Sequence, residues 1–324
     1  MDNIVNLINA AVLAGAPLLF GTLGEILTEK SGNLNLGVEG MMFMGAVSGL
    51  ASSMVAEKLF AAGSALPIAL FAVLGAFLFG ALGALIYGFL TVTLRANQNV
   101  TGLTLSIFGT GLANFLGETL AQGAGGYAAV GAEAKAVFAS IHIPFLSDIP
   151  VLGRLLFSYN FLVYLGVAVA IALWWFLKRT RAGLNLRAVG ENPATADAAG
   201  VDVTKYKYLA TCIGGGICGI GGMYVSMVTC SGVWVHNGVS GLGWIAVALV
   251  IFAAWSPLRA LIGSLVFGGL SVMRMYVHIG IPMEIYDMVP YVATVLVLIF
   301  TSIRQKKESM QPASCGINYF REDR

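Results

Sequence analysis

Charged side chains are scarce in this 324-residue chain, of which Asp, Glu, Lys and Arg make up 10%. Ordinary soluble domains carry about 25%. Long stretches contain none of the four residue types, and one of them runs over residues 208–258. A helix needs about 20 apolar residues to cross the hydrocarbon core of a membrane. With 58% hydrophobic residues, the chain is predicted to be an all-α, polytopic transmembrane bundle of about 8–10 spans.

Several chemical motifs are also missing. The sequence has no Gly-x-x-x-x-Gly-Lys-Ser/Thr phosphate loop, so we do not expect it to bind ATP itself. Its four cysteines lack metal-ligand spacing, and the predicted spans hold no paired carboxylates or Ser/His/Asp set. A net charge of +2 is too small to indicate nucleic acid as a partner. We therefore expect a non-catalytic membrane subunit without a metal or cofactor of its own.

Nine apolar segments are interpreted as membrane spans. They cover residues 4–24, 37–55, 66–94, 98–117, 160–177, 208–229, 243–256, 259–275 and 287–303. With the N-terminus outside and the C-terminus inside, fourteen of the eighteen Lys and Arg residues face the cytoplasm, as the positive-inside rule requires. We predict one transmembrane domain over 1–304, a mobile, polar cytoplasmic tail over 305–324, and a long outer connection over 118–159.

Small side chains recur every fourth residue in the third and sixth predicted spans. The rows are Ala72, Ala76, Gly80, Ala84 and Gly88; Gly215 and Gly219; and Gly214, Cys218 and Gly222. Such rows let helix backbones approach closely in a membrane. Close helix packing is the favoured interpretation, and flexibility for gating is the alternative.

A polar island, residues 178–207, interrupts the apolar spans and holds six of the eighteen basic residues. Asn192 is a good N-cap, and Pro193 suits the first position of a helix. Gly200 can close a helix in the left-handed conformation. We predict a short capped helix between Pro193 and Gly200 on the cytoplasmic face, with Thr204 capping the next helix. A rigid exposed helix of this kind is suited to binding a partner protein.

Polar residues recur at every fourth position of the fourth predicted span. The row consists of Gln98, Gly102, Ser106, Thr110, Asn114 and Glu118. Polar groups at membrane depth are costly unless they meet each other, water or a solute. Two interpretations stay open: hydrogen bonding between helices, or a path for an uncharged polar solute, whose tentative members here are Ser106, Thr110 and Asn114.

Two further stretches could contribute to such a path. The first, NLNLGVEG over residues 33–40, favours irregular backbone and contains Asn33, Asn35 and Glu39. It could expose peptide groups to a ligand, or Glu25 and Glu39 could simply lie at the headgroup level. The second stretch, SGVWVHNGVSG over residues 231–241, contains Trp234 and Asn237. Its Trp could anchor the chain at the interface or stack on a solute.

These segments carry a family resemblance. RAVGENP at residues 187–193 and AAGV at 198–201 resemble the coupling-loop signature of ABC-transporter permeases that import nucleosides, simple sugars and branched-chain amino acids. TEKSGNLNLGVEGMM at residues 28–42 is similar to the pattern after the first span of the nucleoside and simple-sugar branch. The resemblance extends over nearly the whole chain, to about Arg304.

The resemblance implies a permease subunit of the bacterial plasma membrane. It implies three partners: an ABC ATPase that binds the ATP, a second permease, identical or related, and an external substrate-binding protein. The residues implied in ATPase coupling are Arg187, Gly190, Glu191, Asn192, Pro193, Ala199 and Gly200. Nucleosides or simple sugars are the expected solutes. The rival hypotheses are a self-contained secondary transporter or facilitator, for which we find no inverted repeat, and a membrane scaffold without transport activity.

Overall fold

A computed structural model describes residues 2–60, 65–141, 147, 149, 152–276, 283–304 and 310–320. The described chain is a helical bundle without strands, apart from one isolated bridge between Ala129 and Val233. Six of its helices are long and apolar enough to cross a membrane, which confirms the predicted fold class. The helices are α1 (Asp2–Glu29), α2 (Val38–Leu59), α3 (Ala65–Gly88), α4 (Gln98–Gly123), α5 (Ala132–Val137), α6 (Leu152–Leu156), α7 (Phe161–Arg179), α8 (Arg181–Glu191), α9 (Pro193–Ala198), α10 (Val203–Tyr224), α11 (Leu242–Phe252), α12 (Pro257–Tyr276) and α13 (Met283–Arg304), and the π-helical turns η1 (Phe89–Thr93) and η2 (Val225–Thr229) continue α3 and α10.

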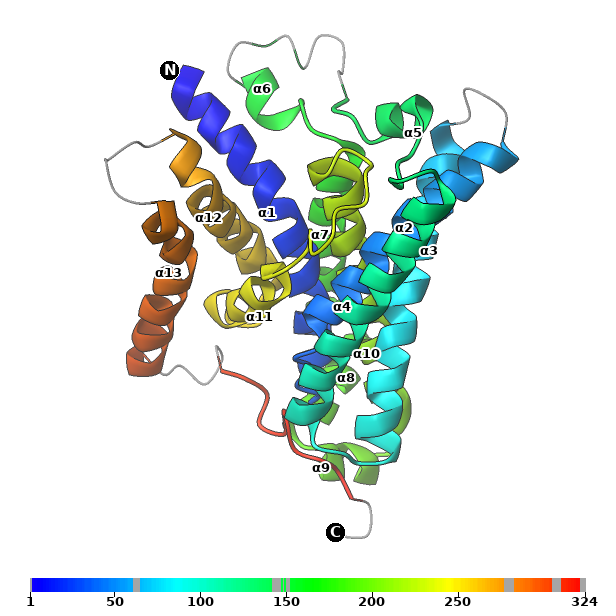
Figure 1. Ribbon diagram of the computed structural model, residues 1–324. Coiled ribbons are helices and arrows are strands. Elements are labelled where there is room, and N and C mark those ends of the chain that lie inside the picture. The colour runs from blue at the N-terminus through cyan, green and yellow to red at the C-terminus, as the bar shows by residue number, and fades with distance from the viewer. Residues whose placement is uncertain are drawn as a thin grey trace.

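Each of the nine predicted spans corresponds to one of these helices, but the apolar stretches described for α11, α12 and α13 are shorter than those of the six long helices. Helix α11 is the shortest of these three helices. It has 11 residues, or about 16 Å of helix, whereas the hydrocarbon core is about 30 Å thick. The expected helix over 243–256 is therefore wrong in length. Residues 230–241 precede α11 as irregular backbone, and α11 begins at the middle of the bundle beside the start of α2 (Figure 1). The marked N and C ends lie at opposite ends of the bundle.

The core forms where α10 packs against α1, α2 and α3. A Cβ atom added at Gly80 would lie 2.4 Å from the Gly215 carbonyl oxygen, and one added at Gly219 would lie 2.3 Å from that of Ala76. The two backbones are thus in direct contact, and this contact confirms the close packing predicted from the small-residue rows. Helix α10 thus packs against α1, α2 and α3 at the core of the bundle.

The polar tail is not free where the structure describes it. The Ser314 N–H donates to the Gly190 carbonyl at 3.0 Å, and the Tyr319 hydroxyl donates to Asp197 Oδ2 at 2.8 Å. Asn318 Nδ2 donates to the Arg95 carbonyl at 2.6 Å. The mobile tail expected from polar composition is therefore wrong for residues 310–320, because two backbone carbonyls and one carboxylate distant in the sequence supply hydrogen-bond partners for it.

Candidate functional site

The short helix α9 is built as its sequence predicts. Asn192 Oδ1 accepts the Thr195 N–H at 3.0 Å, Pro193 takes the first helical position, and Gly200 adopts φ +84°. The next helix differs from the prediction, because Asp202 rather than Thr204 is its N-cap and accepts the Lys205 N–H at 3.0 Å. Both residue types make good caps, so the sequence alone did not separate them.

One face of α9 is anchored and the other is open. Ala196 is buried in a small cluster with Val189 and Val203, and Tyr319 of the tail packs on it. The outward residues are small: Thr195, Ala198, Ala199 and Gly200 are exposed. A cap at each end and an anchored inner face hold α9 in one orientation. It therefore presents a rigid, shallow surface that a partner protein could contact closely.

Helix α8 was not predicted from the sequence. It precedes α9 and packs against the connection between α1 and α2. Thr180 caps α8 by accepting the Gly183 N–H at 3.0 Å. Near its end, a Cβ atom added at Gly190 would lie 2.4 Å from the Lys30 carbonyl oxygen. Glu191 Oε2 accepts the Ala313 N–H at 3.4 Å. Of the predicted coupling residues, Gly190 and Glu191 therefore also contact the α1–α2 connection and the tail.

The α1–α2 connection, residues 30–37, is a buried irregular segment that we call the inner segment. Side chains satisfy its backbone from several sides. The Leu34 N–H donates to Gln98 Oε1 at 2.7 Å, its carbonyl accepts the Tyr87 hydroxyl at 2.6 Å, and the Leu36 carbonyl accepts Ser106 Oγ at 2.8 Å. A buried peptide group without a partner costs as much as a lost hydrogen bond. These contacts therefore hold the inner segment in place between α3 and α4.

The predicted pathway residues of this region are used inside the protein. Asn33 Nδ2 donates to Thr211 Oγ1 at 3.0 Å, and Asn35 Oδ1 accepts the Gly37 N–H at 2.9 Å. Glu25, completely buried, accepts the Asn35 N–H at 3.0 Å. Glu39 Oε2 accepts the Gly241 N–H at 3.2 Å. Each of these two carboxylates therefore binds the backbone of an irregular segment, and their position at the headgroup level stays a prediction.

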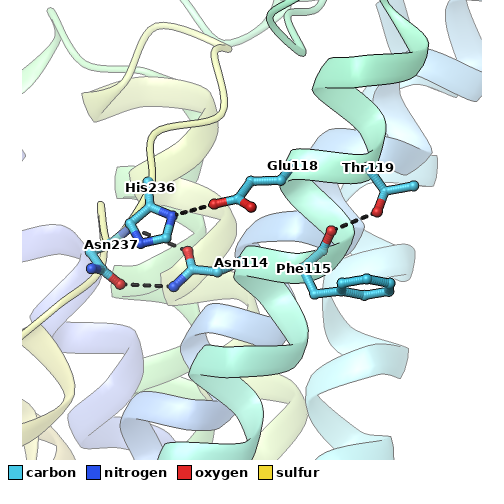
Figure 2. A network of polar contacts seen from close by, with 6 residues as sticks. All are labelled: Asn114, Phe115, Glu118, Thr119, His236 and Asn237. Atoms are coloured by element: carbon cyan, nitrogen blue, oxygen red, sulfur yellow. Dashed lines mark hydrogen bonds and ion pairs between the residues drawn. The ribbon is translucent and has the colours of Figure 1, made fainter.

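Residues 230–241, which we call the outer segment, pack against the other end of α4. Asn114 Nδ2 donates to Asn237 Oδ1 at 2.8 Å, and the Asn237 N–H donates back to Asn114 Oδ1 at 3.3 Å. One turn further on, His236 Nδ1 and Glu118 Oε1 are 2.7 Å apart, and both side chains are 57% exposed. Figure 2 shows Asn114 and Glu118 pointing from α4 toward the segment that carries His236 and Asn237.

Trp234 lies against α4 instead of projecting outward. A Cβ atom added at Gly117 would lie 2.1 Å from its indole, and the Trp234 backbone N–H donates to the Ala128 carbonyl at 2.8 Å. The Trp234 Nε1 atom is buried and has no hydrogen-bond partner among the described residues. Trp234 is thus a packing residue, between α4 and the outer connection.

The polar row of α4 therefore divides into two contacts with an unused residue between them. Gln98 and Ser106 hold the inner segment, and Asn114 and Glu118 hold the outer segment. Thr110 lies between the two contacts, half-buried, and no hydrogen bond joins its hydroxyl to another described side chain or backbone group. The row is hydrogen-bonded within the protein at both ends, while its middle leaves a hydroxyl available.

Comparison with known proteins gives a consistent result. The family model described as the permease component of branched-chain amino acid transport systems matches residues 6–298. The chain is 32% identical to the nucleoside ABC transporter permease protein NupC of Lactococcus lactis, covering 98% of this chain and 99% of NupC. It is 34% identical to the guanosine ABC transporter permease protein NupQ of Bacillus subtilis, covering 90% of each. It is 37% identical to TsgC13 of Haloferax volcanii, provisionally named a glucose ABC transporter permease, over 85% of this chain and 78% of that protein.

Proposed function

Because the chain belongs to the family of permease components of branched-chain amino acid transport systems, we propose that it forms the solute path of an ABC importer for nucleosides. It is a multi-pass protein of the inner membrane, and its relatives are permeases, as befits a non-catalytic subunit. The family implies an ATPase and a substrate-binding protein as partners. The proposed complex also contains a second permease, identical or related, and its ATP is bound by the ATPase.

Helix α9 is the observation that carries the coupling part of this proposal. It is capped at both ends, anchored by Ala196, and open on a face of small residues. In the proposal this face docks on the ATPase. A rigid helix transmits displacement better than a loop does, because its backbone hydrogen bonds do not have to rearrange.

The contacts of α8 suggest how such a displacement would reach the membrane. Gly190 touches the Lys30 carbonyl, and Lys30 begins the inner segment. That segment is hydrogen-bonded to Gln98 and Ser106 of α4. Movement of α9 toward the membrane would therefore press on the inner segment and through it on α4, the helix that carries Thr110.

The choice of a nucleoside as solute rests on the relatives and on charge. NupC and NupQ, matched over 90% or more of both chains, are named for nucleoside and guanosine transport. One oxygen of each buried carboxylate, Glu25 and Glu39, already accepts a backbone N–H group, while Glu25 Oε2 has no partner among the described residues. A charged solute would need a compensating buried charge, whereas a nucleoside needs only hydrogen bonds.

Uptake by the assembled importer tests the proposal. Proteoliposomes with the permease, ATPase and binding protein should accumulate labelled guanosine in an ATP-dependent manner. Gly200→Val should lower uptake while ATP hydrolysis continues, because a β-branched residue at φ +84° costs at least about 1 kcal/mol and opens the end of α9. Gly123→Val, where an added Cβ meets nothing within 4 Å, is the matched control.

Two outcomes would contradict the proposal. Guanosine accumulation by the permease alone under a proton or sodium gradient would indicate a secondary transporter. Normal coupling in Gly200→Val would remove α9 from the mechanism. A simple sugar is the second candidate solute, because the relative provisionally named for glucose is 37% identical. Glucose uptake without guanosine uptake would select it.

A further inference from the structure

A second feature of the cytoplasmic end is a basic cavity of about 540 Å³ between α7, α8 and the turn from α11 to α12. Four cationic side chains line it: Lys30, Lys178, Arg187 and Arg259. Glu191 is the single carboxylate among the described residues of its wall. The cavity therefore concentrates positive charge in a protein that has few charges elsewhere.

Two of these cations are in unfavourable surroundings. Arg187 Nε is buried and has no hydrogen-bond partner among the described residues. Burial lowers the pKa of Lys30, and the charge of Arg187 lowers it further, while Glu191 opposes the change. Bringing like charges together in a partly buried cavity is costly. An anion bound beside Arg187 would relieve that cost and supply the missing acceptor for Arg187 Nε.

The wall of the cavity at the α11–α12 turn has unusual geometry. Ala254 and Trp255 both have positive φ, 48° and 53°, a conformation that is strained for residues with a Cβ. The Trp255 indole N–H donates to Glu29 at the end of α1, which holds the turn in place. The strained turn presents Trp255 and the following first turn of α12, with Arg259, to the cavity.

The wall of the cavity contains residue types that are typical of the headgroup level of a membrane. Trp174 and Lys178 come from the final turns of α7, with Lys178 Nζ 6.0 Å from the centre of the Trp174 ring. Tryptophan and basic residues are enriched at this level of a span. Basic pockets between transmembrane helices on the cytoplasmic side bind the headgroups of anionic lipids. We propose that this cavity binds a phosphate group, that of an anionic phospholipid, between Lys178 and Arg187.

The side chains that line the cavity are suited to binding a phosphodiester. The planar guanidinium of Arg187 offers several N–H donors to phosphate oxygens, and Lys178 offers a point charge. The apolar wall formed by Leu177 and Pro257 borders the spans, where acyl chains lie. The site is separate from the solute path and does not depend on which solute is carried. Since Arg187 and Glu191 belong to α8, a bound lipid would brace the helix that leads to α9.

Lipid binding to the full-length chain in neutral detergent tests the proposal. Fluorescent phosphatidylglycerol should bind more tightly than fluorescent phosphatidylcholine. Lys178→Gln combined with Arg187→Gln should reduce phosphatidylglycerol affinity about 25-fold, because each cation at the surface contributes about fivefold. Arg179→Gln combined with Arg181→Gln removes the same charge from the same junction without touching the cavity wall, and it should leave the affinity within about twofold.

Each other outcome has a definite meaning. Equal affinity of wild type and the Lys178/Arg187 variant, or equal loss in the Arg179/Arg181 control, would overturn the proposal. Competition by inorganic phosphate, beyond that of chloride at equal ionic strength, would identify a soluble anion as the ligand and overturn the lipid assignment. Should the double variant fold poorly, Lys178→Gln alone changes an exposed side chain and should still cost about fivefold.

Discussion

The inner and outer segments are both irregular connections that contact α4, but their polar groups are held differently. The inner segment is fixed by buried side chains, Gln98, Tyr87 and Ser106, that bind its peptide groups. The outer segment is held by the Asn114–Asn237 pair and by His236 and Glu118, which are 57% exposed. Water can replace the contact between His236 and Glu118, but it cannot reach the buried side chains that hold the inner segment. The inner segment is thus suited to transmitting force, and the outer segment to opening and closing.

The outer segment meets the start of α2, directly after the inner segment, where Glu39 accepts the Gly241 N–H. A displacement of the inner segment would therefore reach the outer segment by two routes, through Glu39 and along α4. The predictions below test this contrast between a rigid inner segment and a loosely held outer one.

The largest effect is expected where α8 presses on the inner segment. In Gly190→Val the new Cβ would lie 2.4 Å from the Lys30 carbonyl oxygen, and a buried backbone atom cannot move aside as a side chain can. Overpacking of this kind costs about 1–3 kcal/mol. We expect ATP-dependent uptake to fall at least about tenfold. Gly111→Val on α4, where a Cβ meets nothing within 4 Å, is the control and should remain well folded. A wild-type rate of uptake for Gly190→Val would show that the contact between Gly190 and Lys30 does not link α8 to the inner segment.

The second prediction removes one hydrogen-bonding side chain from the inner segment. Gln98→Leu leaves the Leu34 N–H and Asn318 Oδ1 without their partner. A buried donor without a partner costs about 1–3 kcal/mol, so the thermal unfolding midpoint in detergent should fall. Gln122→Leu makes the same change at an exposed position of the same helix and should have little effect. Equal midpoints for the two variants would mean that the inner segment is not held by this bond.

The third prediction concerns Thr110, between the two segments. Thr110→Val keeps the shape of the side chain and removes a hydroxyl that has no described partner, so stability should not change. If the middle of the α4 row lines the solute path, guanosine uptake should fall about two- to tenfold, the value of one neutral hydrogen bond. Uptake per assembled complex equal to wild type would assign the row to packing alone.

The smallest effect is expected at the outer segment. Replacing Glu118 and His236 by glutamine removes an exposed contact between an imidazole and a carboxylate, and exposed contacts of this kind contribute about 0–1 kcal/mol. The unfolding midpoint should therefore stay close to that of wild type, and the difference should shrink further at high salt. A loss as large as that of Gln98→Leu would remove the contrast between the two segments.

Local features of the sequence predicted the spans and the coupling helix well. Hydropathy located nine apolar segments, and Asn192, Pro193 and Gly200 defined α9 because helix caps act over a few residues. Hydropathy placed the start of α11 within one residue but its end four residues too late. The chain leaves the helix there because Ala254 and Trp255 adopt positive φ.

The partners of the inner segment could not be predicted from the sequence. Leu34 finds its partners 64 and 53 residues away, in Gln98 and Tyr87. The fourfold row in α4 indicated that its polar residues had a common role, but not that they bind two different segments. The prediction of a mobile tail was wrong because its partners, Gly190 and Asp197, are also distant in the sequence and its polar composition does not indicate them.

The docked tail has a consequence for biosynthesis. Ser314 and its partner Gly190 are 124 residues apart, and a ribosome adds about 5–20 residues per second. For roughly 6–25 seconds after α8 and α9 are synthesised, the contacts with Ser314 and Tyr319 cannot yet form. A nascent or truncated chain thus exposes α8 and α9 without the tail contacts. Under the proposed docking of α9 on the ATPase, assembly would be biased toward chains whose translation has passed residue 319.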